Sequence, residues 1–448
     1  MRIIKQFNLS FFIRIKTHLV IQYSPYFLLK RIFVLAKFEI DLNLPDVKIL
    51  NIETTKTNDM VITVKSTKRS TLCHKCGQKI TKIHGYGEAI MLRHLPILGQ
   101  SVYIRLRPAR FQCDRCDNHP TTREEADWYN QRSKFTKAYE AWLMRMLINS
   151  TIDDVARKED VSSEEVEGVL TRQVETSINW DLIEKLTYFG LDEIALKKGH
   201  KDFVVIVSTR MNDSVQILAV LPDRKKETVK AFLESIPERI KKSIKTVCSD
   251  MYDGYINAVK EVLGNKIKVV IDRFHVAKHY RSCLDSLRKQ ELKRLKKDLH
   301  ETDYAQLKGA MWALRKKGEN LTDQDKYVLS TLFRYSPDLE KAYYLQKNLT
   351  DIFNQNIDKG EASLLIKDWI KSVELSNLTC FEKFITTLNK NWNEILNYFY
   401  HRQRKNSGFV EGLNNKIKVI KRRCYGIFDI NRLFQRISLD LNGYEQFS

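Results

Sequence analysis

The segment Phe189-Gly190-Leu191-Asp192-Glu193-Ile194-Ala195-Leu196 is an apolar run of strand-forming residues that contains two adjacent carboxylates. Short apolar runs bounded by turn residues predict buried strands. Two similar runs follow at 203–209 and 215–221, after the turn segments 198–200 and 211–213. The three runs therefore predict three antiparallel strands linked by hairpins.

The residues beyond these strands predict the rest of an α/β domain. The apolar periodicity indicates a helix over 227–240, a strand over 244–248, a helix over 255–263 and a strand over 267–271. Three antiparallel strands followed by helix, strand, helix and strand form the plan of a ribonuclease-H-like fold. The helical pattern over about 276–400 is interpreted as a helical insertion, and 410–422 as the final helix.

Three carboxylates occupy suggestive positions in this plan. Asp192 lies in the first strand, Asp250 follows the fourth, and Glu411 opens the last helix. The first and fourth strands are neighbours in such a sheet, so Asp192 and Asp250 are expected to converge, with Glu411 supplied by the covering helix. Carboxylates held together repel one another unless cations neutralise them. Two Mg²⁺ or Mn²⁺ ions acting on a phosphodiester would do so.

Each acid also has an ordinary structural explanation. Asp192 could be an acid at the end of a strand, Asp250 a helix cap, and Glu411 an acid stabilised by a helix dipole. Strand alternation allows only one of Asp192 and Glu193 to point into the site. The combination of the three positions with a strongly basic chain favours the metal-site interpretation.

Two further residues follow the fifth strand, in Asp272-Arg273-Phe274-His275. This D-x-x-H pair could orient DNA or the carboxylates, or it could simply join the sheet to the insertion. Both interpretations stay open.

The chain is basic, with a formal net charge of +21, which indicates a polyanionic partner. Ten basic residues against two acids lie between 401 and 436, around Glu411. Such charge often marks only a solvated surface, but around a lone acid it favours contacts with the DNA backbone. The predicted phosphate-binding residues are Lys416, Lys418, Lys421, Arg422 and Arg423.

Four of the eight cysteines form two C-x-x-C pairs, Cys73 with Cys76 and Cys113 with Cys116. Tetrahedral Zn²⁺ needs four converging ligands, and each pair supplies two thiolates from one turn. Alternating residues over 50–64 predict a strand, and those over 90–107 place Val102, Ile104 and Leu106 on one face. The pattern is typical of a zinc ribbon with structural zinc, although two chance pairs of buried thiols remain the alternative.

A helix-turn-helix is predicted next. Helical periodicity covers 134–148, a short helix includes Val155 and Ala156, and Ser162 with Glu165 forms the signature of a capping box for a third helix. The third helix carries three glutamates, Glu164, Glu165 and Glu167, and this acidity argues against its reading DNA bases.

Composition excludes several classes. A hydrophobic content of 43% is that of a globular protein, and 16 Gly with 8 Pro are too few for an all-β fold. Uninterrupted apolar stretches long enough for a membrane span are absent from the sequence. The aromatic and basic segment 1–40 lacks the features of a secretory signal, and its role stays open between an extension outside the fold and a surface-binding segment.

These motifs resemble those of bacterial insertion-sequence transposases of the ISL-three type over about residues 45–438. The matching text is Cys73-His74-Lys75-Cys76-Gly77, Phe111-Gln112-Cys113-Asp114-Arg115-Cys116, Gly190-Leu191-Asp192-Glu193, Asp272-Arg273-Phe274-His275, Glu411-Gly412-Leu413-Asn414-Asn415-Lys416-Ile417-Lys418 and Arg423-Cys424-Tyr425-Gly426. The implied organisation is an α/β multidomain chain with an extension over 1–45, a zinc ribbon over 46–130, a helix-turn-helix over 131–180 and a DDE catalytic domain over 181–448.

The resemblance implies a function as well. Asp192, Asp250 and Glu411 would be the catalytic triad, and the four cysteines the zinc ligands. The protein would bind double-stranded DNA at the terminal inverted repeats of an insertion sequence, cleave it, and join the released 3′-hydroxyl to target DNA in the bacterial cytoplasm, at the nucleoid. Cutting two ends favours a homodimer or a higher homo-oligomer. The alternatives are an inactive transposase relic or DNA-binding regulator, a nuclease or resolvase on the same plan, and an RNA-binding protein.

Overall fold

A computed structural model describes residues 16–19, 34–37, 40–196, 203–211, 214–400 and 408–447, with side chains over 40–196, 203–211, 214–400 and 412–447. Most of the predicted extension 1–45 lies outside these ranges. The chain divides into two compact units, Met1–Met144 and Arg145–Ser448. In the first, β1 (Lys16–Leu19) and β2 (Val34–Lys37) pair antiparallel.

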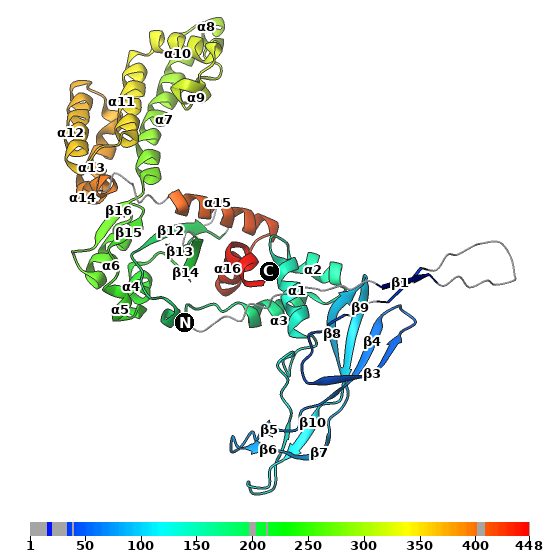
Figure 1. Ribbon diagram of the computed structural model, residues 1–448. Coiled ribbons are helices and arrows are strands. Elements are labelled where there is room, and N and C mark those ends of the chain that lie inside the picture. The colour runs from blue at the N-terminus through cyan, green and yellow to red at the C-terminus, as the bar shows by residue number, and fades with distance from the viewer. Residues whose placement is uncertain are drawn as a thin grey trace, which may run out of the picture. The chain divides into compact units, whose positions relative to one another are not determined.

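A four-stranded sheet forms the main core of the first unit (Figure 1). Its strand order is β3 (Val47–Thr54), β4 (Met60–Ser66), β9 (Gln100–Leu106) and β8 (Ile90–Ile97). As predicted, Val102, Ile104 and Leu106 share a face, and all three are buried. The prediction of one strand over 50–64 is wrong. The backbone turns between Thr55 and Asp59, where Asn58 adopts a positive φ that asparagine tolerates well.

The paired cysteines lie in turns next to short strands. β7 (Lys82–Tyr86), β10 (Ala109–Gln112) and β11 (Thr121–Arg123) form one small sheet, and β5 (Thr71–Leu72) pairs with β6 (Lys79–Ile80). Phe111 of β10 is fully buried and packs with Ile80 and Ala109 against Cys73 and Cys113. So small a core is typical of a domain whose stability depends on a metal.

The predicted succession of helices follows. α1 spans Lys137–Leu147, α2 Ile152–Glu159 and α3 Ser163–Gln173. Asp160 ends α2 in the left-handed conformation, and Ser162 begins α3. The capping box is confirmed: the Glu165 N–H donates to Ser162 Oγ (3.2 Å) and the Ser162 N–H donates to Glu165 Oε2 (3.0 Å).

A five-stranded mixed sheet lies at the centre of the second unit. Its order is β14 (Ser214–Leu221), β13 (Phe203–Met211), β12 (Tyr188–Ala195), β15 (Thr246–Ser249) and β16 (Lys268–Ile271). The first three strands along the chain are antiparallel, whereas β15 and β16 run parallel to β12. The predicted order of these strands, and the neighbouring position of the first and fourth, are confirmed.

Each face of this sheet is covered by its own helices. α4 (Lys226–Ser235) and α6 (Asp253–Leu263) pack on the face that carries Leu191 and Val207, next to the short α5 (Glu238–Lys241). α15 (Gly408–Arg423) and α16 (Ile430–Phe447) pack on the face that carries Ile194 and Ile206. Residues 227–240 were predicted as one helix, but the chain breaks at Ile236, because the following Pro237 disfavours a helical conformation there.

The prediction that 410–422 is the last element is wrong, because α16 follows it. α16 has no purely apolar face: Gln435, Arg436 and Asp440 are buried together with Leu433 and Ile437. A search for apolar periodicity therefore passes over this helix.

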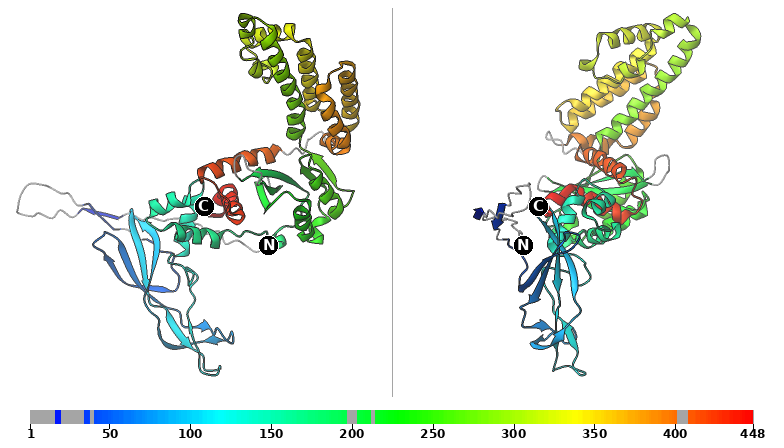
Figure 2. Two further views of the ribbon diagram at one scale, coloured as in Figure 1. Left: turned by 180° about the vertical axis from the view of Figure 1, so that it is seen from behind. Right: turned by 90° about the vertical axis from the view of Figure 1, so that its right-hand side faces the viewer.

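The residues between β16 and α15 are almost wholly helical, and in both views of Figure 2 they form a body of their own. This helical body starts with α7, directly after β16, and meets the sheet again where Asn397 Nδ2 donates to the carbonyl of Val269 (2.9 Å). Its helices are α7 (Arg273–Asp298), α8 (Glu301–Ala305), α9 (Ala310–Ala313), α10 (Asp323–Tyr335), α11 (Pro337–Asn354), α12 (Lys359–Leu375), α13 (Glu382–Lys390) and α14 (Trp392–Leu396). Within the described ranges, every helix of the chain is too short or too polar to span a lipid bilayer.

A pair of variants tests the packing of α15. Ile417 is 0% exposed against Ile194 and Ile206, whereas Val419, two positions on, is 44% exposed. Ile417→Ala should lower the free energy of unfolding by about 2–5 kcal/mol, because it leaves a cavity. Val419→Ala should change it by less than about 0.5 kcal/mol. Urea unfolding of the full-length chain measures both, and equal effects would contradict the packing described.

Candidate functional site

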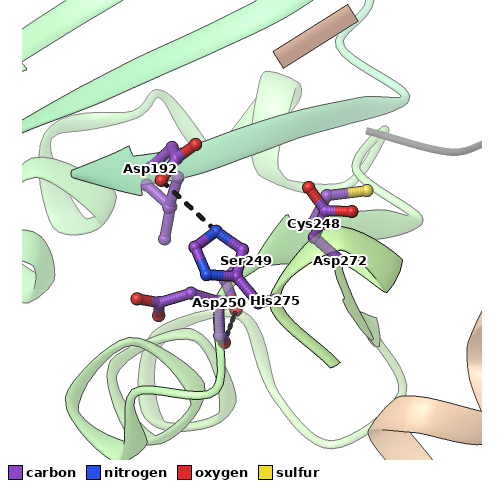
Figure 3. Close-up of a pocket in the computed structure, with 7 residues that line it drawn as sticks. Asp192, Cys248, Ser249, Asp250, Asp272 and His275 are labelled. Carbon is purple, nitrogen blue, oxygen red and sulfur yellow. Dashed lines mark hydrogen bonds and ion pairs between the residues drawn. The ribbon is translucent and has the colours of Figure 1, made fainter. Parts of the chain in front are cut away.

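One strand, the ends of two further strands and one helix start enclose a small acidic pocket in the second unit (Figure 3). The pocket lies beside the middle of β12 and at the carboxyl ends of β15 and β16, next to the first turn of α7. This is the edge of an α/β sheet at which ligands usually bind. The lining residues are Leu191, Asp192, Cys248, Ser249, Asp250, Asp272 and His275.

The register of β12 against β15 explains why Asp192 and Asp250 meet. Gly190 is paired with Cys248 in the parallel ladder. Asp192 follows Gly190 by two residues, and Asp250 follows Cys248 by two residues. Both line the pocket. The convergence expected from the sequence is thus present for these two carboxylates.

Asp192 is held by a set of donors. Its side chain lies on the α15 face of the sheet, and the residue is only 7% exposed. Oδ1 accepts from the backbone N–H of Glu193 (2.7 Å), and Oδ2 accepts from the side-chain amide of Asn414 in α15. Nε2 of His275 lies 3.7 Å from Oδ1. The carboxylate is therefore fixed from the strand, from α7 and from α15.

Asn414 was not predicted as a site residue. A signal was available, because Asn414 follows Glu411 by three positions, and helix positions three apart share a face. Its Oδ1 is buried without a hydrogen-bond partner among the described residues. An oxygen in that state suits a bound cation or water.

Asp250 carries the opposite wall of the pocket. Its Oδ1 accepts from the backbone N–H of Tyr252 (2.9 Å). Burial raises the pKa of Asp250 above its ordinary value, and the negative charges of Glu193 and Asp192 raise it further, against the lowering effects of the Tyr252 N–H and His275. A nearby cation would relieve this penalty on the charged form.

Asp272 and His275 both belong to the pocket, so the structure brings the D-x-x-H pair to the carboxylates. Asp272 caps α7 by accepting from the Phe274 N–H (2.9 Å), which fixes the helix start that carries His275. In Figure 3 the imidazole faces Asp192. Burial lowers the pKa of His275, but the hydrogen bond and charge of Asp192, with the charges of Asp250 and Asp272, outweigh burial and give a net increase.

Glu193 points away from Asp192, to the other face of the sheet, as strand alternation requires. Its Oε2 lies 3.5 Å from Arg224 Nη1, an ion-pair distance without a hydrogen bond. Glu193 does not line the acidic pocket.

Glu411 lies in the first turn of α15, but its side chain is outside the described side chains. What the structure gives is the helix that carries it, anchored to Asp192 through Asn414.

The predicted phosphate-binding residues of α15 separate into two groups. Lys418 and Arg422 are exposed. The other three have protein partners: Lys416 donates to the carbonyl of Asp440, Lys421 to the carbonyls of Ala195 and Leu196, and Arg423 to the Asp440 carboxylate (2.6 Å). Burial also lowers the pKa of Lys421.

In the first unit, the four paired cysteines converge. The sulfur–sulfur distances are 3.9 Å for Cys73–Cys116, 3.8 Å for Cys76–Cys113 and 3.7 Å for Cys113–Cys116. Zn–S bonds of about 2.3 Å in a tetrahedron require sulfurs about 3.8 Å apart, so the cluster fits Zn²⁺ without rearrangement.

The surroundings of the thiols differ. The hydrogen bond with Cys76, burial and the neighbouring Cys113 raise the pKa of Cys116 to about 12. Backbone N–H groups of Cys76 and Lys75 lower the pKa of Cys73 to about 6, which favours the thiolate that a metal binds. Across the described side chains, this is the one group of three or more His, Cys, Asp or Glu whose ligand atoms lie within 4.8 Å of one another.

Comparison with known families and proteins identifies three segments of the chain. A family described as "Transposase" matches residues 189–437, the helix-turn-helix domain of transposase family ISL3 matches 124–174, and the zinc-finger of transposase IS204/IS1001/IS1096/IS1165 matches 69–116. The last match includes all four clustered cysteines, which supports Zn²⁺ as a cofactor.

Two curated relatives extend over most of the chain. The transposase for insertion sequence element IS1001 of Bordetella parapertussis is 28% identical over 378 residues, which cover 84% of this chain and 90% of the relative. The transposase for IS1557 of Mycobacterium tuberculosis is 22% identical over 400 residues, covering 84% and 87% respectively. With a DNA-binding helix-turn-helix and a transposase domain that spans more than half of its length, the chain belongs to the ISL3 family of transposases.

Proposed function

We propose that this transposase binds the terminal inverted repeats of an insertion sequence, cleaves the DNA there and joins the ends to target DNA at a DDE site made by Asp192, Asp250 and Glu411. The observation that carries the proposal is the convergence in one pocket of Asp192, within β12, and Asp250, which directly follows the adjacent parallel strand β15. Glu411 is assigned because α15, which carries it, reaches Asp192 through Asn414.

The surrounding architecture supports a ribonuclease-H-like catalytic domain over 181–448. The strand order β14-β13-β12-β15-β16, with three antiparallel strands followed by two parallel ones, is the plan expected of that fold. The helical body α7–α14 leaves this sheet after β16 and returns before α15, so we interpret it as an insertion. The zinc ribbon and the helix-turn-helix are assigned to 46–130 and 131–180, and 1–45 to an extension.

The pocket suits Mg²⁺ or Mn²⁺. Its lining includes the carboxylates of Asp192, Asp250 and Asp272, and hard cations prefer oxygen ligands. Asp192, Asp250 and Glu411 would hold the ions. Divalent cations bound between carboxylates and a phosphodiester activate the attacking oxygen and stabilise the leaving oxygen.

The protein's own groups prepare this site. Asn414 and the Glu193 N–H fix the rotamer of Asp192, and the Tyr252 N–H fixes that of Asp250. His275 faces Asp192 and is oriented by the Asp272 cap of α7, so we assign this pair an accessory role in positioning the carboxylate. Carboxylates that are pre-positioned lower the cost of organising the reacting groups.

DNA binding is assigned to two exposed basic surfaces of the second unit. Exposed Lys418 and Arg422 of α15 are suited to contact the phosphate backbone near the pocket, and α2 exposes Arg157 and Lys158. The four clustered cysteines are assigned as ligands of a structural zinc ion that shapes the ribbon. Since an element has two ends to cut, a homodimer or higher homo-oligomer in the bacterial cytoplasm, at the nucleoid, completes the proposal.

The triad is tested by Asp192→Ala, Asp250→Ala and Glu411→Ala, on a labelled duplex carrying the terminal repeat that flanks the gene. Wild type should cut it only with Mg²⁺ or Mn²⁺. Each variant should lose at least about a thousandfold in cleavage rate while still binding the duplex, because the metal ligands are lost and the DNA-binding surfaces are kept.

Glu193→Ala is the matched control, since Glu193 neighbours Asp192 but lies outside the pocket, and it should retain cleavage within about tenfold. Tight binding with no cutting by folded wild type would contradict the proposal and favour an inactive relic or a DNA-binding regulator.

The zinc assignment is tested by Cys113→Ser, with Cys380→Ser as control. Wild type and Cys380→Ser should bind one zinc ion per chain, while Cys113→Ser should lose it, because serine is a poor replacement for a thiolate ligand. Atomic emission on the purified chains measures the metal. Equal zinc in all three proteins would show that Cys113 is not a ligand.

A further inference from the structure

Asp440, a residue of α16 outside the proposed triad, is a buried carboxylate that is 3% exposed. Its Oδ1 accepts from the backbone N–H of Asn149 (3.1 Å) and lies 3.5 Å from Arg436 Nη2. Its Oδ2 accepts from Arg423 Nη1 (2.6 Å). One side chain thus bonds residue 149 beside the helix-turn-helix, α16 itself and α15.

A second buried side chain strengthens the link to the helix-turn-helix. Arg436 is 1% exposed, and its Nη2 donates to the carbonyls of Ser150 (2.7 Å) and Leu147 (3.2 Å). These carbonyls belong to the end of α1 and the turn before α2. The packing is close, because a Cβ at Gly443 would lie 2.9 Å from Ile148 Cγ1.

α16 also holds α3. Gln435 Nε2 donates to the carbonyl of Val174, which ends α3 (3.0 Å), and Arg432 forms an ion pair with Glu167 on that helix. Part of the acidity of α3 is thus neutralised within the protein.

Asp440 also accepts hydrogen bonds from two residues of α15. Lys416 donates to the backbone carbonyl of Asp440, and Arg423 to the carboxylate. Between the first turn of α15 and Lys416 stands Asn414, which bonds Asp192. An unbroken chain of contacts therefore runs from the helix-turn-helix through Asp440 to the acidic pocket.

Stability alone does not account for this cluster. Buried ion pairs are often no better than apolar residues of the same volume, and Arg436 leaves Nε and Nη1 buried without partners among the described residues. What such a network does provide is one fixed geometry, because each bond needs both elements in register.

We propose that the cluster of Asp440, Arg436 and Arg423 couples the helix-turn-helix to α15, so that DNA bound by the helix-turn-helix sets the position of the helix that carries Asn414 and Glu411. These three are positioning residues, and the inference rests on the proposed function. It assigns Arg423 to the protein interior and not to a phosphate, although its neighbour Arg422 is exposed.

The test compares Arg423→Gln with Arg422→Gln on the terminal-repeat duplex. For Arg423→Gln we expect an affinity within about twofold of wild type, an unchanged salt dependence, and a single-turnover cleavage rate at saturating protein at least tenfold lower. For Arg422→Gln we expect weaker binding and a salt slope reduced by about one, since one phosphate contact is lost. Glu445→Gln, an exposed acid on α16, should match wild type in both assays.

Asp440→Asn should reproduce the cleavage defect, and the double variant Arg423→Gln/Asp440→Asn should be no slower than the slower single variant, because both remove one interaction. Should Asp440→Asn fail to fold, Arg423→Gln decides alone, since its side chain is 24% exposed and its loss is better tolerated. A wild-type cleavage rate in Arg423→Gln, or a binding defect like that of Arg422→Gln, would overturn the coupling while leaving the proposed function intact. Absence of cleavage by wild type would instead overturn the proposed function and this inference with it.

Discussion

The parallel pairing of β12 with β15 is the constraint on which the acidic pocket depends. Parallel strands end at the same edge of a sheet, and the register that pairs Gly190 with Cys248 brings Asp192 and Asp250 together two residues later. A slip of one residue would turn each of these side chains to the opposite face. The apolar residues of both strands, buried on two sides, fix that register, so the packing of the sheet and the geometry of the pocket have the same cause.

The helices on the two faces of the sheet make different kinds of contact. α4 and α6 bury one face with ordinary apolar contacts, whereas α15 and α16 bury the other face and also carry polar side chains that reach into it. Asn414, Lys421, Arg423, Arg436 and Asp440 are all bonded inside this layer. A substantial part of the positive charge near the carboxyl terminus therefore organises the protein itself, and Lys418 and Arg422 remain exposed toward a polyanion.

Much of the fold was predictable from the sequence, and the failures have physical reasons. Apolar runs gave β12 to β16 in the right order because strands buried on both faces leave a strong signal. The break at Pro237 and the turn at Asn58 went unnoticed because one or two residues override the periodicity of a longer segment. α16 was missed because Arg436 and Asp440 are buried as partners, and burial of a charged pair cannot be recognised from one residue.

The residues of the candidate sites also separate into those that could be predicted from the sequence and those that could not. The cysteine cluster and the pair Asp192 and Asp250 could be predicted, since spacing or strand order alone brings them together. Asn414, and the internal bonds of Lys416, Lys421 and Arg423, could not, because they depend on how α15 is rotated on the sheet and on where α16 returns. Neither the rotation of α15 nor the position of α16 can be predicted from the local sequence.

The contact between Asp192 and Asn414 spans 222 positions of the chain. A ribosome adds roughly 5–20 residues per second, so about 10–45 s pass between the synthesis of these two residues. During that interval β13 to β16 and the helical body are synthesised, but α15 is still missing, and a product terminated before α15 would lack it permanently. The order of the segments along the gene thus leaves Asp192 without its Asn414 partner in every polypeptide that ends before α15.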